Sequence, residues 1–160
     1  MKRPVVVLVL ALLPVVALTG CMPSLIPARE TSIQKFIEVP GMPKDVIYEK
    51  SRIWIAKTFR SSKAVIEYEN KETGLIIGNG VIHYAVPVGI GMETQVPVRF
   101  TMREDIKDGK IRITFDNLLE GTMGNPVKYQ QSMDKISPRL HALANELGSF
   151  IRESKMDREW

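Results

Sequence analysis

Cysteine, histidine and the common catalytic motifs are scarce in this sequence of 160 residues. A single cysteine excludes a disulfide scaffold. The two histidines, His83 and His141, have no second metal ligand at a zinc-binding spacing, so the sequence predicts no metal site. We interpret His141 as a solvated helix residue. Because a GxSxG motif is also missing, the sequence favours neither a catalytic residue nor a cofactor.

The composition is that of one ordinary globular domain. Hydrophobic residues make up 44% and charged residues 25% of the chain, which excludes a long disordered protein. A chain of 160 residues is also too short for a multidomain enzyme. The apolar residues are unevenly distributed, because residues 4–18 carry no charge at all.

The N-terminus has the pattern of a secretion signal. Lys2 and Arg3 precede the uncharged run PVVVLVLALLPVVAL. A transmembrane helix needs about 20 apolar residues, so this shorter run is more typical of a signal-peptide core. Pro4 and Pro14 also disfavour a uniform buried helix. We therefore predict a signal peptide over residues 1–20.

The residues Leu18, Thr19, Gly20 and Cys21 end this run. They resemble the lipobox of bacterial lipoproteins, in which the signal peptidase cuts before a cysteine whose thiol carries a diacylglycerol. The resemblance implies that Cys21 joins the protein to membrane lipid and is neither a nucleophile nor a metal ligand. The alternative is an ordinary cleaved signal followed by a chance cysteine. Met22 stands where an aspartate retains enterobacterial lipoproteins in the inner membrane, which implies an outer-membrane protein facing the periplasm or the cell surface.

The net charge of the mature chain is small. Removing Lys2 and Arg3 from 22 basic residues leaves 20 against 18 acidic residues, so the charge falls from +4 to +2. Such a charge is weak support for nucleic-acid binding, and we expect no nucleic-acid partner.

The remaining patterns predict one α+β domain over residues 36–154, between a tether (residues 21–35) and a charged tail (residues 155–160). An early strand should cover residues 36–39. One amphipathic helix should run from Pro43 to about Phe59. A second should begin with Ser137 as its N-cap and Pro138 as its first helical residue. Whether residues 132–136 form an earlier helical turn stays open.

Four further strands are expected between the helices. They fall near residues 64–69, 75–84, 96–103 and 111–116, where apolar and polar residues alternate or apolar residues dominate. The order β-α-β-β-β-β-α predicts an antiparallel sheet of about five strands with two helices on one face.

The dipeptide Asp108-Gly109 predicts a tight hairpin between the last two of these strands. With a two-residue turn, apolar residues face apolar ones, and an opposite-charge pair lies on the other face. Glu104 is the misfit of this register, and we expect it near the sheet margin. The predicted pairs are Lys107–Lys110, Ile106–Ile111, Asp105–Arg112, Glu104–Ile113, Arg103–Thr114 and Met102–Phe115.

Several short motifs along residues 36–151 carry a family resemblance. They are Val39-Pro40-Gly41, the helix around Trp54, the run from Thr73 to Gly78, and the hairpin over residues 108–112. With the order of elements, they resemble a family of bacterial lipoprotein and secreted domains of unknown function. The resemblance implies a fold like that of the TATA-box-binding protein, and it implies no activity.

Three further groups have ordinary structural explanations. The motifs Gly78-Asn79-Gly80 and Gly89-Ile90-Gly91 do not open a helix, so we read them as strand or loop glycines. Glu67 and Glu69 share a strand face in the predicted pattern, where a solvated sheet surface explains them better than acid–base chemistry. If Asn70 stands opposite Leu75, His83 has core-side parity, whereas a one-residue bulge would place it outside.

Arg99, Arg103 and Arg112 are expected on the sheet face opposite the helices, which the TATA-box-binding protein uses on DNA. Asp105 and Asp116 should interleave with these arginines, so we predict a salt-bridged surface and no bare basic stripe.

The segment Ala85–Met92 (AVPVGIGM) has no charged residue and lies between two predicted strands. We predict that it is an apolar loop, which either folds onto the core or meets a partner. Its candidate partner-binding residues are Val86, Val88, Ile90 and Met92.

These observations favour a non-catalytic, lipid-anchored protein of the cell envelope that binds another envelope protein or supports an assembly. The alternative is a binding module for a small envelope ligand such as a glycan or a lipid. No constellation of residues supports an enzyme.

Overall fold

The computed structural model describes residues 25–59 and 66–153. The predicted signal peptide, the lipobox with Cys21 and the charged tail lie outside these residues, and so do the first residues of the strand expected at 64–69.

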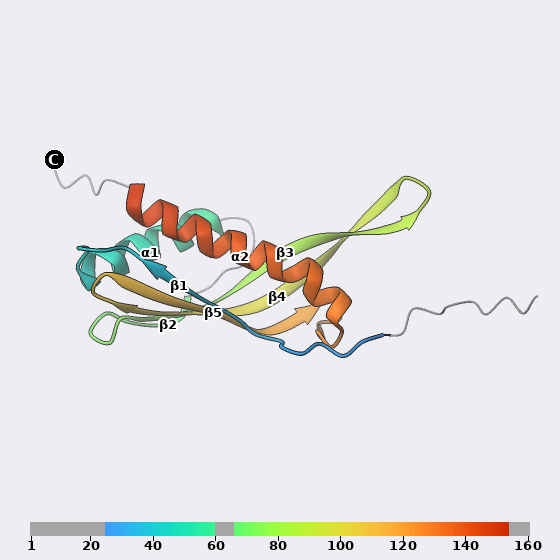
Figure 1. The fold of residues 1–160 in the computed structure, drawn as a ribbon, viewed down its shortest axis with the longest axis horizontal. Coiled ribbons are helices and arrows are strands. Elements are labelled where there is room, and N and C mark those ends of the chain that lie inside the picture. Colours follow the sequence, from blue (N-terminus) through green and yellow to red (C-terminus); the bar gives the residue numbers. More distant parts are fainter. Residues whose placement is uncertain (1–24, 60–65, 154–160) are drawn as a thin grey trace, which may run out of the picture.

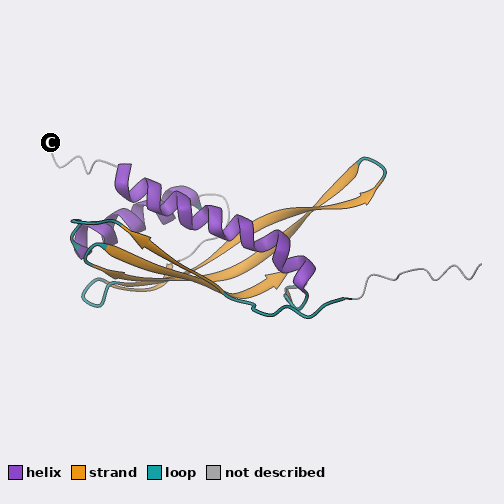
Figure 2. Ribbon diagram, in the orientation of Figure 1, coloured by secondary structure: helices purple, strands orange, loops and turns teal. Residues whose placement is uncertain are grey.

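Six antiparallel strands form one sheet, and two helices cover one of its faces (Figures 1 and 2). The strand order is β1-β5-β4-β3-β2, with the short β6 beside β5. This architecture confirms the predicted α+β class, with β6 as an unpredicted addition. The elements are β1 (Ile33–Glu38), α1 (Lys44–Thr58), β2 (Ile66–Asn70), β3 (Leu75–Gly89), β4 (Met92–Lys107), β5 (Lys110–Glu120), β6 (Asn125–Pro126) and α2 (Gln130–Glu153).

The register of the β4–β5 hairpin is the predicted one. All six expected pairs, from Lys107–Lys110 to Met102–Phe115, are neighbours in the structure. The register brings Phe100 and Phe115 into edge-to-face contact at 5.4 Å between ring centroids, beneath the helices. The Asp108-Gly109 turn and the apolar alternation together specify this pairing, because a one-residue slip would turn every core side chain outward.

The domain begins earlier than expected. Strand β1 starts at Ile33, whose side chain is buried opposite Phe115. Before it, Pro27 forms a β-bridge with Tyr129. The part of the predicted tether that the structure describes therefore lies against the domain, because it contributes Ile33 to the core and backbone hydrogen bonds to the start of α2.

Helix α2 begins at Gln130, so the prediction that Ser137 is its N-cap was wrong. Pro138 lies inside the helix, where the missing N–H and the ring cost about 3 kcal/mol or more. Met133 and Ile136 are buried in the additional turns, and each gains roughly 1.5–3 kcal/mol by leaving water. Their burial offsets the cost of the proline.

No helix within residues 25–59 and 66–153 is long and apolar enough to cross a membrane.

Glu104 is fully buried beneath α1, so the expectation that it lies near the sheet margin was wrong. Its position follows from the register, which points it to the same side as Met102 and Ile106. Neither carboxylate oxygen has a hydrogen-bond partner among the described residues. Burial raises the pKa of Glu104 from 4.5 to about 7, and the neighbouring Ser51 offsets only part of this shift.

The buried Glu104 predicts a fall in stability with pH. The folded protein holds a proton on Glu104 more tightly than the unfolded chain does, so it binds more protons between pH 4.5 and about 7. The contribution of this residue is therefore most favourable below pH 4.5, and it declines by roughly 3 kcal/mol as the pH rises through 7. Urea denaturation of the protein and of its Glu104→Gln variant should show a stability difference that changes by this amount. A difference independent of pH would contradict the burial of the carboxyl group.

A second prediction compares the two faces of the β4–β5 hairpin. Phe115→Ala should lower the free energy of unfolding by about 3–5 kcal/mol, because Phe115 is fully buried. Asp105→Ala should cost only about 0–1 kcal/mol, since its ion pairs with arginines lie at the surface. Chemical denaturation of both variants measures the ranking, and a larger cost for Asp105→Ala would contradict the observed facing of the strands.

Candidate functional site

The β3–β4 hairpin continues beyond the sheet as a projecting arm (Figure 1). The two strands remain paired from Tyr84–Val96 through Val86–Thr94 to Gly89–Met92. Only Ile90 and Gly91 form the turn, and Gly91 has a positive φ of 71° that suits a glycine.

The prediction that Ala85–Met92 is a loop was therefore wrong, because these residues belong to the strands and their turn. Pro87 and the run Gly89-Ile90-Gly91 interrupt the alternation of apolar and polar residues that is typical of a strand. Pairing with the polar residues of β4 nevertheless provides hydrogen-bond partners for the backbone N–H and C=O groups of this segment.

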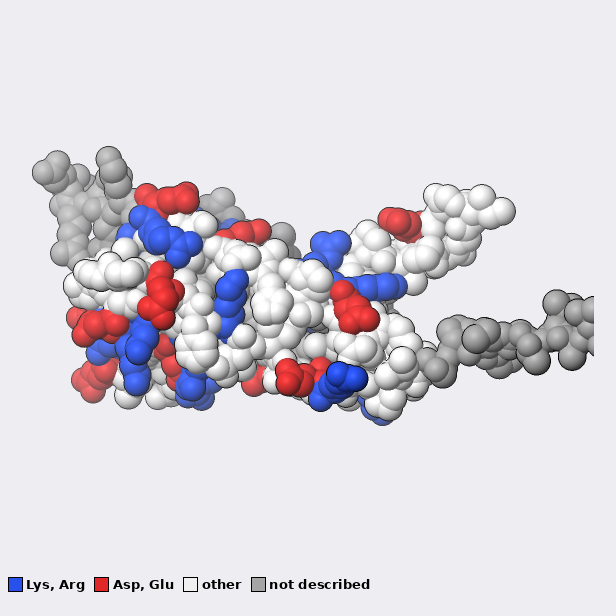
Figure 3. Space-filling model, in the orientation of Figure 1, with Lys and Arg blue, Asp and Glu red and all other residues white. Residues whose placement is uncertain are grey.

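We call the last residues of the arm, Val88–Met92, the tip. Val88 is 58% exposed, Met92 is 61% exposed and Ile90 is fully exposed. Val86 is different, because it is partly buried and packs against the core at the root of the arm. The tip is uncharged (Figure 3), and the next residue in the sequence is the acidic Glu93. Three of the four predicted contact residues are thus open to solvent and do not fold back onto the core.

The root of the arm is fixed by contacts from three elements. The phenol of Tyr84 donates a hydrogen bond to Glu120 on β5, with 3.0 Å between the oxygens. Burial, and then this bond, raises the pKa of Tyr84. The ammonium of Lys135 on α2 lies 5.6 Å from the centroid of the Tyr84 ring. The N–H of Gly121 donates to the carbonyl of Pro97 at 2.8 Å. The domain therefore presents the tip on a supported base.

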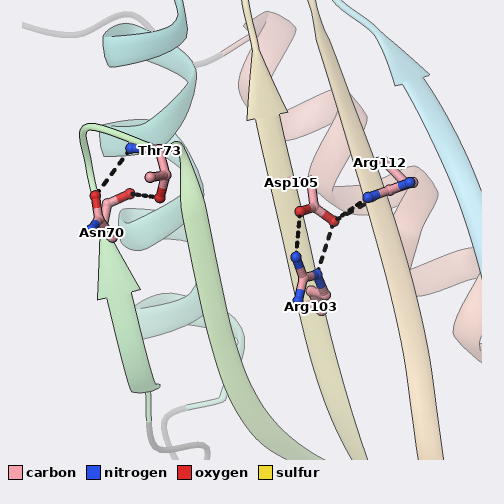
Figure 4. Close-up of polar contacts among 5 residues, drawn as sticks. All are labelled: Asn70, Thr73, Arg103, Asp105 and Arg112. Carbon is pink, nitrogen blue, oxygen red and sulfur yellow. Dashed lines mark hydrogen bonds and ion pairs between the residues drawn. The ribbon is translucent and has the colours of Figure 1, made fainter.

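The open sheet face carries the expected ion pairs (Figure 4). Asp105 accepts hydrogen bonds from Arg103 at 2.8 and 3.0 Å and from Arg112 at 3.0 and 3.2 Å. Arg103, with Arg112 second, lowers the pKa of Asp105 below its usual range. Asp116 pairs with Thr101, between Arg99 and Arg103 along β4. Acidic and basic side chains alternate on this face, as the sequence predicts.

Glu67 and Glu69 do not share a face, contrary to the predicted pattern. The pairing of β2 with β3 shifts between Ile66 and Tyr68, which turns Glu67 outward. The carboxylate of Glu67 accepts a hydrogen bond from Asn79 on the open face. Glu69 instead lies on the helix side, 2.8 Å from the guanidinium of Arg52. The two carboxylates therefore cannot act on one substrate.

His83 is exposed and points away from the core. Asn70 does stand opposite Leu75, in a turn closed by hydrogen bonds between Asn70 and Thr73 (Figure 4). Leu75 itself faces outward, however, because Ile76 carries the core-side parity of β3. The expectation that this pairing would give His83 core-side parity was therefore wrong.

His141 is exposed on α2, as predicted. It lines an open groove of about 660 Å³ between α2 and the segment before β1, together with Ser32, Gln34 and Asp134. Within the described ranges, no group of three or more His, Cys, Asp or Glu residues could hold a metal ion.

The two GxG motifs are structural, as expected. Gly78 and Gly80 lie within β3, where a Cβ at Gly80 would stand only 2.5 Å from the ring of Phe100. The second motif forms the turn of the arm. The lack of charge in the sequence identifies the residues of the tip, but it does not predict the paired strands that carry them away from the core.

Comparisons with known proteins agree with this fold. A crystal structure of a DUF4468 family protein from Bacteroides ovatus is similar, with a TM-score of 0.61 and 13% identity, over 84% of this chain and 94% of that one. A TBP-like protein from Parabacteroides distasonis is similar with a TM-score of 0.58 and 10% identity, over 78% and 94% of the two chains. Among curated proteins, none matches the sequence.

The family comparison covers the sheet from β1 to β5. Residues 34–120 match the model of a domain of unknown function, DUF4468, which is described as having a TBP-like fold. The match includes the β3–β4 arm and ends before α2. The chain therefore belongs to the DUF4468 family of TBP-like domains.

Proposed function

We propose that this protein is a lipid-anchored, non-catalytic binding domain of the bacterial cell envelope, and that the tip of the β3–β4 arm makes its contact. The observation that carries the proposal is the exposure of Val88, Ile90 and Met92 at the end of a supported arm. Apolar side chains clustered in this way are costly in water, and they commonly mark surfaces that meet a protein or a membrane.

The lipobox-like residues Leu18–Cys21 support the envelope location. Acyl chains on Cys21 would each contribute about 0.8 kcal/mol per buried methylene, which gives stable anchoring when several chains are present. Met22 after the cysteine favours the outer membrane, with the domain in the periplasm.

The anchor and the tip depend on one another energetically. Each tip side chain would contribute roughly 1.5–3 kcal/mol on full burial. Association of two free molecules costs about 4–15 kcal/mol, so three such side chains would hold a free partner only weakly. Anchoring confines the domain to the membrane and raises the effective concentration of whatever lies there, so a small contact becomes sufficient.

The anchor predicts a defined behaviour of a Cys21→Ser variant. Without the thiol, no diacylglycerol can be attached, and the lipoprotein signal peptidase has no substrate. We expect the variant to accumulate as unprocessed precursor, and the unchanged chain to incorporate radiolabelled palmitate and to fractionate with the outer membrane. A soluble, normally cleaved Cys21→Ser protein would contradict the anchor and favour an ordinary secretion signal.

The contact predicts protection of the tip in the envelope. Once Cys21 is lipidated, Ile90→Cys introduces the only free thiol of the mature chain. A hydrophilic maleimide should modify this thiol readily in detergent-solubilised protein and at least about tenfold more slowly in intact envelopes, where the tip is buried in its contact.

Ile53→Cys is the matched control, because Ile53 is an exposed apolar residue on α1, away from the arm. Its modification should proceed at similar rates in both preparations. Equal rates for Ile90→Cys in the two preparations would contradict the proposed role of the tip.

A further inference from the structure

Only a few residues separate the domain from its proposed lipid anchor. The N–H of Gln130 donates to the carbonyl of Ile26 at 2.8 Å, and the N–H of Ala28 donates to the carbonyl of Lys128 at 2.8 Å. The N-terminal segment is thus held on the domain from Ile26 onward. Four residue steps separate Leu25 from Cys21, and a fully extended chain covers about 14 Å over that distance. The end of the domain at Leu25 must therefore stay close to the membrane that holds Cys21.

The arm projects at this same end of the molecule (Figure 1). Gly89 lies five residues beyond Tyr84, the last core residue of β3, which corresponds to about 16 Å of strand. The reach of the arm and that of the N-terminal residues are therefore comparable. Because both extend from the same end of the molecule, a membrane at that end would meet the lipid on Cys21 and the tip together.

Most of the exposed large apolar side chains gather at this end. They stand on the tip, on the first described residues and on the segments that flank β6, whereas the remaining three lie on β1, α1 and β2. The members at this end are Leu25, Ile26, Val88, Ile90, Met92, Met123 and Tyr129. The exposed basic residues Arg29 and Lys128 stand beside them, where lipid headgroups would meet the protein.

We propose that the tip of the arm inserts into the lipid surface of the membrane that anchors Cys21, as a second point of attachment. The inference rests on the lipid anchor of the proposed function and identifies the partner of the tip. Val88, Ile90 and Met92 enter the acyl boundary, and Glu93 remains at the headgroups because a carboxylate is costly to bury.

The size of the tip favours lipid over a protein partner. Stable protein interfaces bury about 800 Å² on each partner, with packed and complementary surfaces. Three side chains around a two-residue turn expose much less than that. A lipid surface needs no shape complementarity, and it accepts apolar side chains one by one, as it does those of interfacial segments.

Depth-resolved fluorescence quenching tests this proposal on the full-length, lipidated protein. The Ile90→Cys thiol carries an environment-sensitive nitrobenzoxadiazole label, and the protein is reconstituted into vesicles of phosphatidylethanolamine and phosphatidylglycerol. Lipids with a spin label near the top of the acyl chain should reduce the emission by at least about twofold, because the label lies at that depth. The same label on Ile53→Cys should lose little emission.

A second substitution keeps the test independent of the label. Val88→Asp in the labelled Ile90→Cys chain places a charge on an exposed side chain, so the fold should persist while insertion becomes unfavourable. Quenching at residue 90 should then fall to the level of residue 53. Equal quenching at residues 90 and 53 before this substitution would overturn the proposal.

The experiment distinguishes failure of lipid insertion from failure of the anchor. A label on residue 90 that is open to water in pure lipid but shielded in native envelope vesicles would overturn lipid insertion in favour of a protein contact, and the proposed binding function would stand. A wild-type chain whose Cys21 accepts the label and that does not remain with the vesicles would overturn the anchor, and with it both proposals.

Discussion

The pairing of β3 with β4 holds the centre of the sheet and also forms the arm outside it. Near Leu75 and Asp105 the two strands have neighbours on both sides, β2 and β5. Beyond Tyr84 the same ladder continues without neighbours. Backbone hydrogen bonds of the arm are thus an extension of those in the core, and the position of the tip depends on the most central contact of the fold.

The core explains why the arm leaves the sheet where it does. Val98 and Tyr84 are the last buried residues of the central strands before the arm, and the helices cover the sheet up to that point. Farther along, Val86 and Val96 still pack partly against the core, whereas Gln95, Thr94 and Glu93 of β4 are exposed. Polar side chains make an unsupported ribbon tolerable in water, so the apolar residues of the tip stand out against their surroundings.

Short sequence motifs predict those parts of the fold that depend on neighbouring residues alone. The Asp108-Gly109 turn sets the β4–β5 register, and Pro43 marks the start of α1, where the structure places it as the N-cap residue. Predictions from local patterns failed in two situations. In one, a register shift inserted an extra residue into a strand; in the other, burial of other side chains outweighed the cost of a proline inside a helix. The shift near Glu67 separates two carboxylates, and nothing in the alternation of that strand announces it.

The other failures have a common cause in tertiary packing. Pro138 is a strong signal for a helix start, but the burial of Met133 and Ile136 extends α2 through it. Glu104 is a strong signal for a sheet margin, but the register of its neighbours carries it into the core. In both cases a local preference worth a few kcal/mol yields to contacts with residues far away in the sequence. Such contacts cannot be read from a window of neighbouring residues.

The role proposed for the arm depends on the segment before β1, because this segment limits the distance between the domain and the anchor. A single lipid anchor on a long tether would leave a domain free to turn over the membrane, and any exposed surface could then meet a partner. The hydrogen bonds of Ile26 with Gln130 and of Ala28 with Lys128 would restrict that freedom, because only a few residues would separate the anchor from the domain. A second contact through Ile90 would fix the remaining rotation, since two separated points on a supported framework define an orientation. The ion-paired sheet face around Asp105 would then point in a constant direction relative to the membrane. In the proposed arrangement the binding energy of the tip would serve orientation, which requires far less than capture of a free partner, and a tip of three apolar side chains would meet that smaller requirement.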